Sequence, residues 1–224
     1  MEKMEINVAG KRIYLYGERE QAVPLVIVNA FEGDGENLYH KIKEQGNKDV
    51  CLGVVSGLIW NDEMTPWQCE PLYKNDDPCK GEAGRYLKEL TEQIIPEVKK
   101  KLANEPTELI IAGYSLGGLF AIYSLYHTDL FAKAVSASGS LWFPEFASYV
   151  QKTKLKKMPQ RVYFSLGDKE ELTKNKMLRC VKEKTLEIYN YFTGIGIETE
   201  FQFNPGNHFK DTDERLAKGI YRVL

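Results

Sequence analysis

A serine lies between glycines in the stretch GYSLG at residues 113–117, which matches the pattern G-x-S-x-G. In this pattern the glycines leave room for a sharp turn between a strand and a helix, and the turn exposes the serine hydroxyl above a sheet. Residues 109–112 are apolar like a buried strand, and apolar residues recur at helical spacing over 116–126. The pattern therefore predicts that Ser115 is a nucleophile. The alternative is a small-residue turn needed only for packing.

A serine hydroxyl needs a base to take its proton, and the base needs a third group that holds its tautomer and stabilises its charge. The chain has three histidines. His40 lies in a polar helical stretch, and His127 follows an apolar helix at its C-terminal end, where the helix dipole favours a cation. We expect His208 to be the base, because its loop, NPGNHF, joins the last predicted strand to the last predicted helix.

The third group is expected after the preceding strand, because proteins with this serine turn order their triad as Ser, then Asp or Glu, then His. That region reads SLGDKEE at residues 165–171 and offers three carboxylates. We predict Glu170, since such loops often read Gly-x-x-acid, with Asp168 and Glu171 as alternatives. Each of the three is also explained as an exposed loop charge or a cap for the next helix.

Attack on an ester carbonyl places negative charge on its oxygen, and preorganised backbone N–H groups stabilise that charge. One donor is expected at Leu116, directly after the nucleophile. The second is expected in the loop after the first buried strand, at Phe31 or Glu32, where nearby glycines permit an unusual backbone path. An ordinary flexible turn is the alternative for that loop.

The elements that would position these residues alternate between apolar strands and amphipathic helices. This alternation predicts an α/β fold with a mostly parallel central sheet and helices on both faces, in a single domain over residues 1–224. Functional residues of such sheets gather at the carboxyl ends of the strands. Strands are expected at 4–8, 12–16, 24–29, 50–56, 108–112, 132–136, 161–166 and 198–203, and helices at 35–45, 82–102 with a bend at Pro96, 116–126, 175–193 and 211–221.

Residues 57–81 form a long segment rich in Pro, Asn, Asp and aromatic residues, which we expect to be an irregular loop over the strand ends. Trp60 and Trp67 in this loop, and Trp142 after the strand that follows the serine turn, are predicted to line an acyl or aryl pocket. Packing beneath the loops is the alternative for each. The segment has five acidic residues against two lysines, which would repel a strongly anionic substrate.

The 224 residues carry a net charge of −2, so no basic excess argues for a nucleic-acid or membrane partner. The N-terminus lacks an apolar leader, and no long apolar run occurs, which predicts a cytoplasmic protein. The four cysteines form no CxxC pair and have no neighbouring histidine, so we expect free thiols and no metal site. Cys69 and Cys79 share one loop and are the one pair that merits attention.

Four motifs together resemble the putative esterase family of α/β-hydrolases: GYSLGG at 113–118, SASGSLWF at 136–143, SLGDKEE at 165–171 and PGNHF at 205–209. That family includes esterase D-type enzymes, enterochelin-type siderophore esterases, and feruloyl and acetyl-xylan esterases. The resemblance covers about residue 24 to the end. It implies an α/β-hydrolase fold with Ser115 as nucleophile, His208 as base and Glu170 as acid.

The expected function is that of a serine esterase acting through an acyl-enzyme on a small or aromatic ester, with siderophore or carbohydrate-linked esters as candidates. No cofactor is expected, and the expected partner is a small-molecule ester. Two alternatives remain at this point. The first is an acyltransferase that uses the same triad, and the second is a binding protein that keeps the fold without turnover.

Overall fold

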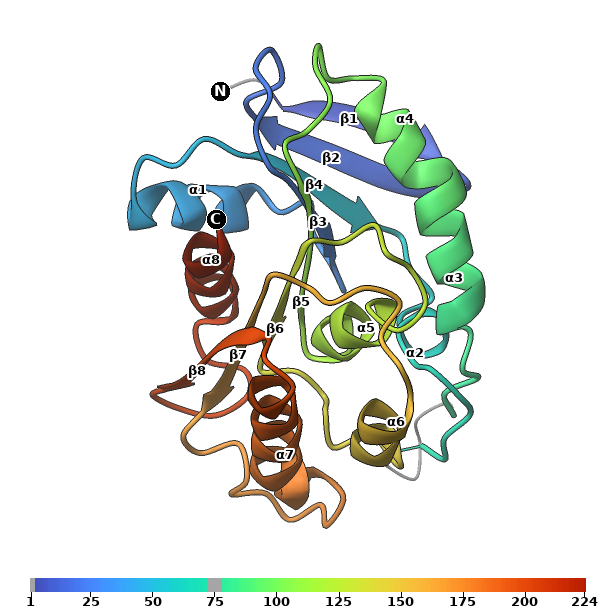
Figure 1. Ribbon diagram of the computed structural model, residues 1–224, viewed down its shortest axis with the longest axis vertical. Helices are drawn as coiled ribbons and strands as arrows, with labels where there is room; N and C mark the ends of the chain where they lie inside the picture. The colour runs from blue at the N-terminus through green and yellow to red at the C-terminus, as the bar shows by residue number, and fades with distance from the viewer. Residues whose placement is uncertain (1–2, 72–77) are drawn as a thin grey trace.

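The computed structural model describes residues 3–71 and 78–224. Within them, the strands form one sheet in the order β1-β2-β4-β3-β5-β6-β7-β8 (Figure 1). β1 pairs with β2, and β2 with β4, in antiparallel fashion, whereas every pairing from β4 to β8 is parallel. The predicted mostly parallel sheet is confirmed. The strands are β1 Met4–Val8, β2 Lys11–Gly17, β3 Leu25–Asn29, β4 Cys51–Ser56, β5 Leu109–Tyr114, β6 Lys133–Ala137, β7 Arg161–Gly167 and β8 Glu198–Asn204.

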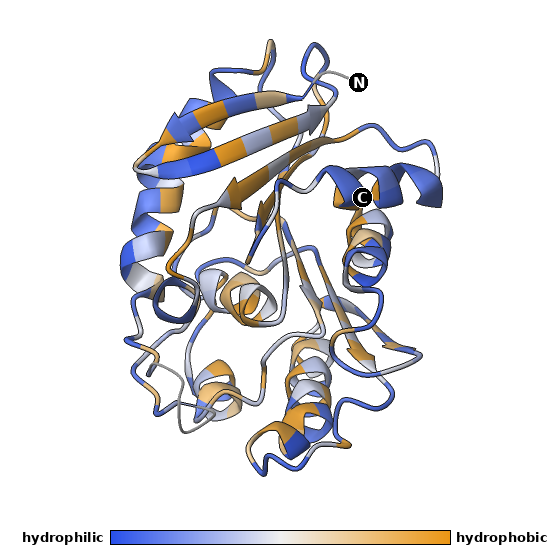
Figure 2. Cartoon of the chain, turned by 180° about the vertical axis from the view of Figure 1, so that it is seen from behind, coloured by the Kyte–Doolittle hydropathy of each residue, from blue (hydrophilic) through white to orange (hydrophobic). Residues whose placement is uncertain are grey.

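Helices cover both faces of the sheet, because the central strands are apolar on both sides. Along β3, Ile27 faces one apolar core, and its neighbours Val26 and Val28 face the other. One face packs against α1 Glu36–Gln45 and α8 Thr212–Val223. The other packs against α3 Ala83–Glu89, α4 Ile95–Lys99, α5 Leu116–Ser124, α6 Phe146–Lys152 and α7 Val181–Gly194. Figure 2 shows hydrophobic residues along the central strands and mainly hydrophilic residues along α1.

The helix predicted over 82–102 is interrupted. Between α3 and α4 the chain forms a π-helical turn, η1 Leu90–Ile94, which ends two residues before Pro96. Proline has no backbone N–H, so the regular hydrogen-bond ladder cannot continue through it, and a wider turn absorbs the break. The predicted disturbance at Pro96 is therefore real, although it takes the form of a π-helical turn instead of a bend in one helix.

Two other predictions need correction. The segment 57–81 is not wholly irregular, because it contains the short helix α2 Trp60–Glu63 and an isolated bridge between Cys69 and Cys79; its residues 72–77 lie outside the described part. The helix expected from residue 175 begins only at Val181, after a 3-10 turn, η2 Leu178–Cys180. The side chains of Thr173 and Asn175 accept hydrogen bonds from N–H groups two residues ahead, which competes with helix formation there.

The carboxyl ends of the parallel strands meet at one edge of the sheet. Ser115 follows β5, Ser138 follows β6, Glu170 lies beyond β7, and His208 lies beyond β8. Residues far apart in the sequence thus gather at one place. No helix in residues 3–71 or 78–224 is both long and apolar enough to cross a bilayer.

Candidate active site

The turn at Ser115 depends on its glycines. Ser115 has φ 57° and ψ −124°, a conformation that L-residues seldom adopt. A Cβ on Gly113 would lie 2.2 Å from the backbone of Gly117, and one on Gly118 would lie 2.9 Å from Gly139 Cα. Only glycine fits at these close approaches. The local sequence therefore enforces the tight strand-to-helix turn that raises Ser115 above the sheet.

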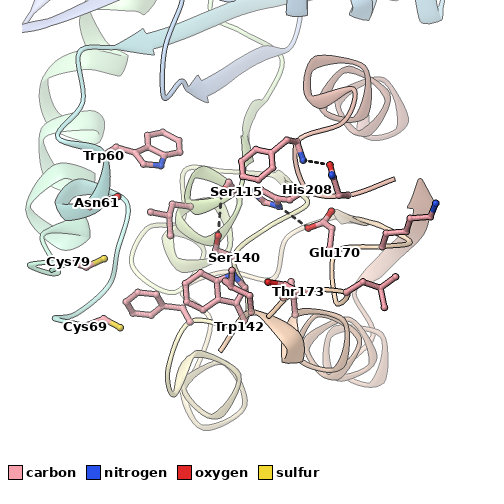
Figure 3. Close-up of a pocket in the computed structure, with 18 of the residues that line it drawn as sticks. Trp60, Asn61, Cys69, Cys79, Ser115, Ser140, Trp142, Glu170, Thr173 and His208 are labelled. Atoms are coloured by element: carbon pink, nitrogen blue, oxygen red, sulfur yellow. Dashed lines mark hydrogen bonds and ion pairs between the residues drawn. The ribbon is translucent and has the colours of Figure 1, made fainter. Parts of the chain in front are cut away.

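His208 lies against the serine hydroxyl. Its Nε2 is 3.0 Å from Ser115 Oγ (Figure 3). Two contacts hold its loop: Asp168 Oδ1 accepts a hydrogen bond from the Gly206 N–H at 2.8 Å, and the Tyr114 hydroxyl donates to the His208 carbonyl at 2.7 Å. The loop that carries the imidazole is thereby held at Gly206 and at His208 itself.

Glu170 completes the array on the far side of the imidazole. Its Oε2 lies 2.8 Å from His208 Nδ1. Its Oε1 accepts hydrogen bonds from the Gly167 N–H at 2.5 Å and the Ser138 hydroxyl at 2.7 Å. Burial raises the pKa of this carboxyl, which is only 8% exposed, but the contacts with His208, Ser138 and Gly167 outweigh burial, and the net pKa is lowered. Glu170 therefore stays ionised beside the imidazole.

Arg215 on α8 supports this carboxylate from behind. Only 2% of the side chain is exposed, and its Nη1 lies 3.3 Å from Glu170 Oε1, 3.2 Å from Ser138 Oγ and 3.3 Å from the Tyr114 hydroxyl. Its Nη2 donates to the Pro205 carbonyl at 3.0 Å, in the loop that carries His208. The arginine therefore ties four strand-end segments together and neutralises the buried charge.

The two alternative acids are engaged elsewhere. Asp168 accepts the Gly206 N–H, as described above, and Glu171 forms an ion pair with Lys182 at 3.0 Å. Of the three carboxylates, Glu170 is the one within hydrogen-bonding distance of His208 among the contacts of the described residues.

The expected oxyanion donors belong to two elements near the serine. The Leu116 N–H occupies the first position of α5, where the helix itself supplies no acceptor. Phe31 and Glu32 follow β3 and line a cavity together with Ser115. Ser140 also contacts the nucleophile. Its hydroxyl lies 3.3 Å from Ser115 Oγ, and its N–H donates to the Ser115 carbonyl at 2.9 Å.

Two cavities meet at Ser115 and His208. One has a volume of about 510 Å³ and the other about 550 Å³. Both are bounded by Trp60 and Phe209 as well as by Ser115 and His208. The first extends toward Trp142, Phe143 and Leu172, and the second toward Phe31 and the glycine-rich loop of residues 33–35.

The tryptophans predicted to line a pocket divide into two groups. Trp60 and Trp142 line the first cavity. Trp67 lines neither of these two cavities in the described part of the chain, so the structure does not place it where it was predicted. Its ring packs against Phe143 and Tyr149, and its Nε1 donates to the Pro144 carbonyl at 3.1 Å. Trp67 therefore supports the wall from behind.

The expected acidity of segment 57–81 also needs correction. Glu63 and Asp62 are buried and paired, Glu63 with Lys11 and Arg85 and Asp62 with Lys80. Lys74, Asp76 and Asp77 lie outside the described residues. Glu70 is the acid of this segment that lines the first cavity within the described part. Among the described acids of the segment, Asp62 and Glu63 are therefore neutralised by ion pairs, and Glu70 is the one left at the cavity wall.

Three residues of the site escaped the sequence prediction: Ser138, Ser140 and Arg215. The two serines carried a signal, because they are polar residues directly after a buried strand. Arg215 carried a weaker signal. It stands four residues before Gly219, which places both on the buried face of α8. A lone arginine on a helix predicts an exposed position far more often than a buried ion pair.

The mostly parallel sheet, its two helical layers and the nucleophile turn define the class of protein, one with an α/β-hydrolase fold. The family model described as "Putative esterase" matches residues 33–211. The chain belongs to this putative esterase family, and the resemblance inferred from its motifs is confirmed.

The chain is also similar to several known proteins. It is 31% identical over 131 residues to the uncharacterized protein YbbA of Bacillus subtilis; the match covers 57% of this chain and 52%, about half, of that relative's length. An IroE-like serine hydrolase from Shewanella oneidensis shares 18% identity at a TM-score of 0.79, with 99% of this chain and 80% of the other covered. The siderophore hydrolase EstB from Aspergillus nidulans shares 17% identity at a TM-score of 0.75, with 100% and 94% covered. At these identities the two solved structures show a shared fold.

Proposed function

We propose that the protein is a serine carboxylic-ester hydrolase in which Ser115 attacks the ester carbonyl and His208 takes the serine proton. The observation that carries the proposal is the continuous array of hydrogen-bonding distances, 3.0 Å from Ser115 Oγ to His208 Nε2 and 2.8 Å from His208 Nδ1 to Glu170 Oε2. This is the geometry of nucleophile, base and orienting acid.

Glu170 keeps the base in the useful tautomer. An ionised carboxylate accepts the Nδ1 proton, which leaves the Nε2 lone pair directed at the serine hydroxyl. The lowered pKa of Glu170 supports this role, because the carboxylate stays charged while the imidazole gains and returns a proton. The imidazolium then donates its Nε2 proton to the leaving alcohol, and water hydrolyses the acyl-enzyme by the same steps.

The developing oxyanion is stabilised by the Leu116 N–H and a second N–H from Phe31 or Glu32. The two donors come from different elements, one from the start of α5 and one from the loop after β3. Such donors typically contribute about 3–4 kcal/mol to stabilising the transition state.

The substrate is an ester with a bulky, largely apolar group on each side of the scissile bond. This follows from the two cavities, which share Ser115 and His208 and extend in different directions. Exposed apolar side chains surround their openings, with Phe31 63%, Leu172 76% and Phe209 84% exposed. Aromatic surfaces left exposed beside a nucleophile are suited to bind apolar or aryl groups. Aryl esters supply such an apolar arm, and the similarity to a siderophore hydrolase supports testing siderophore-type esters first, with carbohydrate-linked aryl esters next.

The test is intact-mass analysis after treatment with a fluorophosphonate, which labels activated serines whatever their substrate. A single adduct on the wild type that is lost in Ser115→Ala and His208→Ala supports the proposed roles, and an ester panel follows. Absence of an adduct on folded wild-type protein favours the binding-protein alternative. Product analysis with added alcohols distinguishes hydrolysis from acyl transfer, because a transferase yields a new ester instead of the free acid.

A further inference from the structure

Two cysteines face each other in the wall of the first cavity. The N–H of Cys69 donates to the carbonyl of Cys79 at 3.0 Å, and the N–H of Cys79 donates back to the carbonyl of Cys69 at 3.0 Å. The two residues thus form an isolated antiparallel bridge. A hydrogen-bonded antiparallel pair holds its Cα atoms about 5.5 Å apart. Disulfides join Cα atoms about 4.4–6.8 Å apart, so this backbone spacing suits one.

Both residues are open to the cavity that holds the nucleophile. Cys69 and Cys79 are half-buried free cysteines that line the 510 Å³ cavity together with Ser115 (Figure 3). The other two cysteines differ, because Cys51 is fully buried in β4, and Cys180 lies in η2 with its thiol donating to the Met177 carbonyl. A small reagent that enters the cavity therefore meets two cysteines whose backbones are paired, beside the proposed nucleophile.

We propose that Cys69 and Cys79 are a reversible redox modification site, which a low-molecular-weight disulfide converts from dithiol to disulfide. One thiolate attacks the reagent RSSR, forming a protein–SR mixed disulfide and releasing RS⁻. The second thiolate attacks the protein sulfur of that mixed disulfide, forms the Cys69–Cys79 bond and releases a second RS⁻. The two protons lost by the cysteines leave with the two RSH molecules. The protein is oxidised by two electrons, and RSSR is reduced by two.

The surroundings make the exchange slow at neutral pH. Burial raises the pKa of both thiols, with the charge of Glu70 adding to the effect at Cys69 and the charge of Cys69 adding to it at Cys79. Asp62 also raises the pKa of Cys79, whereas a hydrogen bond with Thr65 opposes the shift. Because the thiolate is the attacking species, oxidation by RSSR is expected to accelerate as the pH rises.

The bond would change one wall of the cavity without touching the reacting groups. Neither cysteine contacts Ser115, His208 or Glu170 through any hydrogen bond found in the described residues. The next expectation rests on the proposed esterase function: oxidation should change KM for an ester whose bulky arm occupies this cavity. The kcat for a small ester is expected to stay constant.

The test uses the full chain, reduced, freed of reductant and then incubated with glutathione disulfide. After quenching and denaturation, the number of thiols that react with N-ethylmaleimide is expected to fall from the four present in the reduced protein to two. No glutathione should remain attached, and a peptide map should join Cys69 to Cys79. Reductant should restore all four thiols. Cys180→Ser should still form the bond, whereas Cys69→Ser and Cys79→Ser should stop at a stable mixed disulfide with glutathione.

Stable glutathione adducts on the wild type, or four reactive thiols after prolonged incubation above neutral pH, would overturn the modification site. These readouts need no ester turnover, so they separate its failure from failure of the proposed function. Fluorophosphonate labelling of the reduced and oxidised forms tests the esterase proposal itself. A disulfide that forms and leaves KM for bulky esters unchanged would overturn the effect on the cavity.

Discussion

Two buried glutamates, Glu170 and Glu63, hold opposite sides of the same site in different ways. Glu170 binds Arg215 through Oε1 and offers Oε2 to His208. Glu63, 1% exposed, places Oε1 against Lys11 at 2.8 Å and Arg85 at 3.1 Å. Its Oε2 accepts from Lys11 Nζ and the Ile59 N–H, both at 2.7 Å.

The difference lies in what each carboxylate leaves free. Both oxygens of Glu63 are occupied by cations and a backbone N–H, so the residue serves to fix α2, whose first residue is Trp60, against β2 and α3. Glu170 keeps one oxygen for an imidazole, so its charge acts on the reaction. A buried ion pair by itself therefore does not identify a catalytic acid; an oxygen directed at the base does.

The largest effect is expected from Glu170→Gln. The amide presents an N–H toward His208 and favours the wrong tautomer, so kcat should fall by about 10⁴-fold in steady-state ester hydrolysis. Glu171→Gln, which only breaks the exposed pair with Lys182, is the matched control and should retain near wild-type kcat. An equal loss of kcat in both variants would show that Glu170 is not the acid that orients His208.

Glu63→Gln should have the opposite effect to Glu170→Gln: it should lower stability and leave kcat unchanged. Removing the charge leaves the Lys11 ammonium buried with a neutral partner, and breaking a buried pair typically costs about 3–5 kcal/mol. The free energy of unfolding, measured in urea, should fall by that order, while kcat for a small ester is retained. Glu82→Gln removes a more exposed partner of Arg85 and should change stability by about 0–1 kcal/mol. A fall in kcat as deep as that of Glu170→Gln would place Glu63 in the reaction.

Trp60→Ala tests the role of the indole ring at the start of α2, the helix that Glu63 holds in place. A Cβ on Gly117 would lie 3.2 Å from Trp60 Cη2, so the indole ring lies over the nucleophile turn and bounds both cavities. Its loss should raise KM for a bulky ester by about tenfold or more, with a smaller change for a short acyl ester. Trp67→Ala removes an indole that lies behind the wall; it should lower stability and leave this KM ratio unchanged. The comparison fails if Trp67→Ala alters the ratio as strongly.

The smallest effect concerns acid pH. The pKa of Glu170 in the folded protein lies below its ordinary value of 4.5, so its stabilising contribution is fully present above that value and is lost as pH falls through the lowered one. From about pH 6 to about pH 3, the free energy of unfolding of the wild type should therefore fall more steeply than that of Glu170→Gln. Parallel stability curves for the two proteins would contradict the lowered pKa.

Much of the site was predictable because its signals are local. The apolar runs and the glycine pattern around Ser115 predicted the strand, turn and helix that the structure contains, and the Gly-x-x-acid loop favoured Glu170. Trp67 could not be separated from Trp60 in this way, because both lie in one aromatic-rich segment and only packing decides which ring faces the cavity. The start of α7 was misplaced because hydrogen bonds of the Thr173 and Asn175 side chains compete with the helix.

By itself, the sequence determined the sheet, the nucleophile turn and the chain order of serine, acid and histidine, since hydrophobic periodicity and glycine sterics act between near neighbours. Only the tertiary structure decided which carboxylate contacts His208 and which arginine neutralises that carboxylate. It also set Cys69 against Cys79 beside the nucleophile. Arg215 lies 45 residues from Glu170 and 101 from Tyr114, and contacts over such separations depend on how strands and helices pack together.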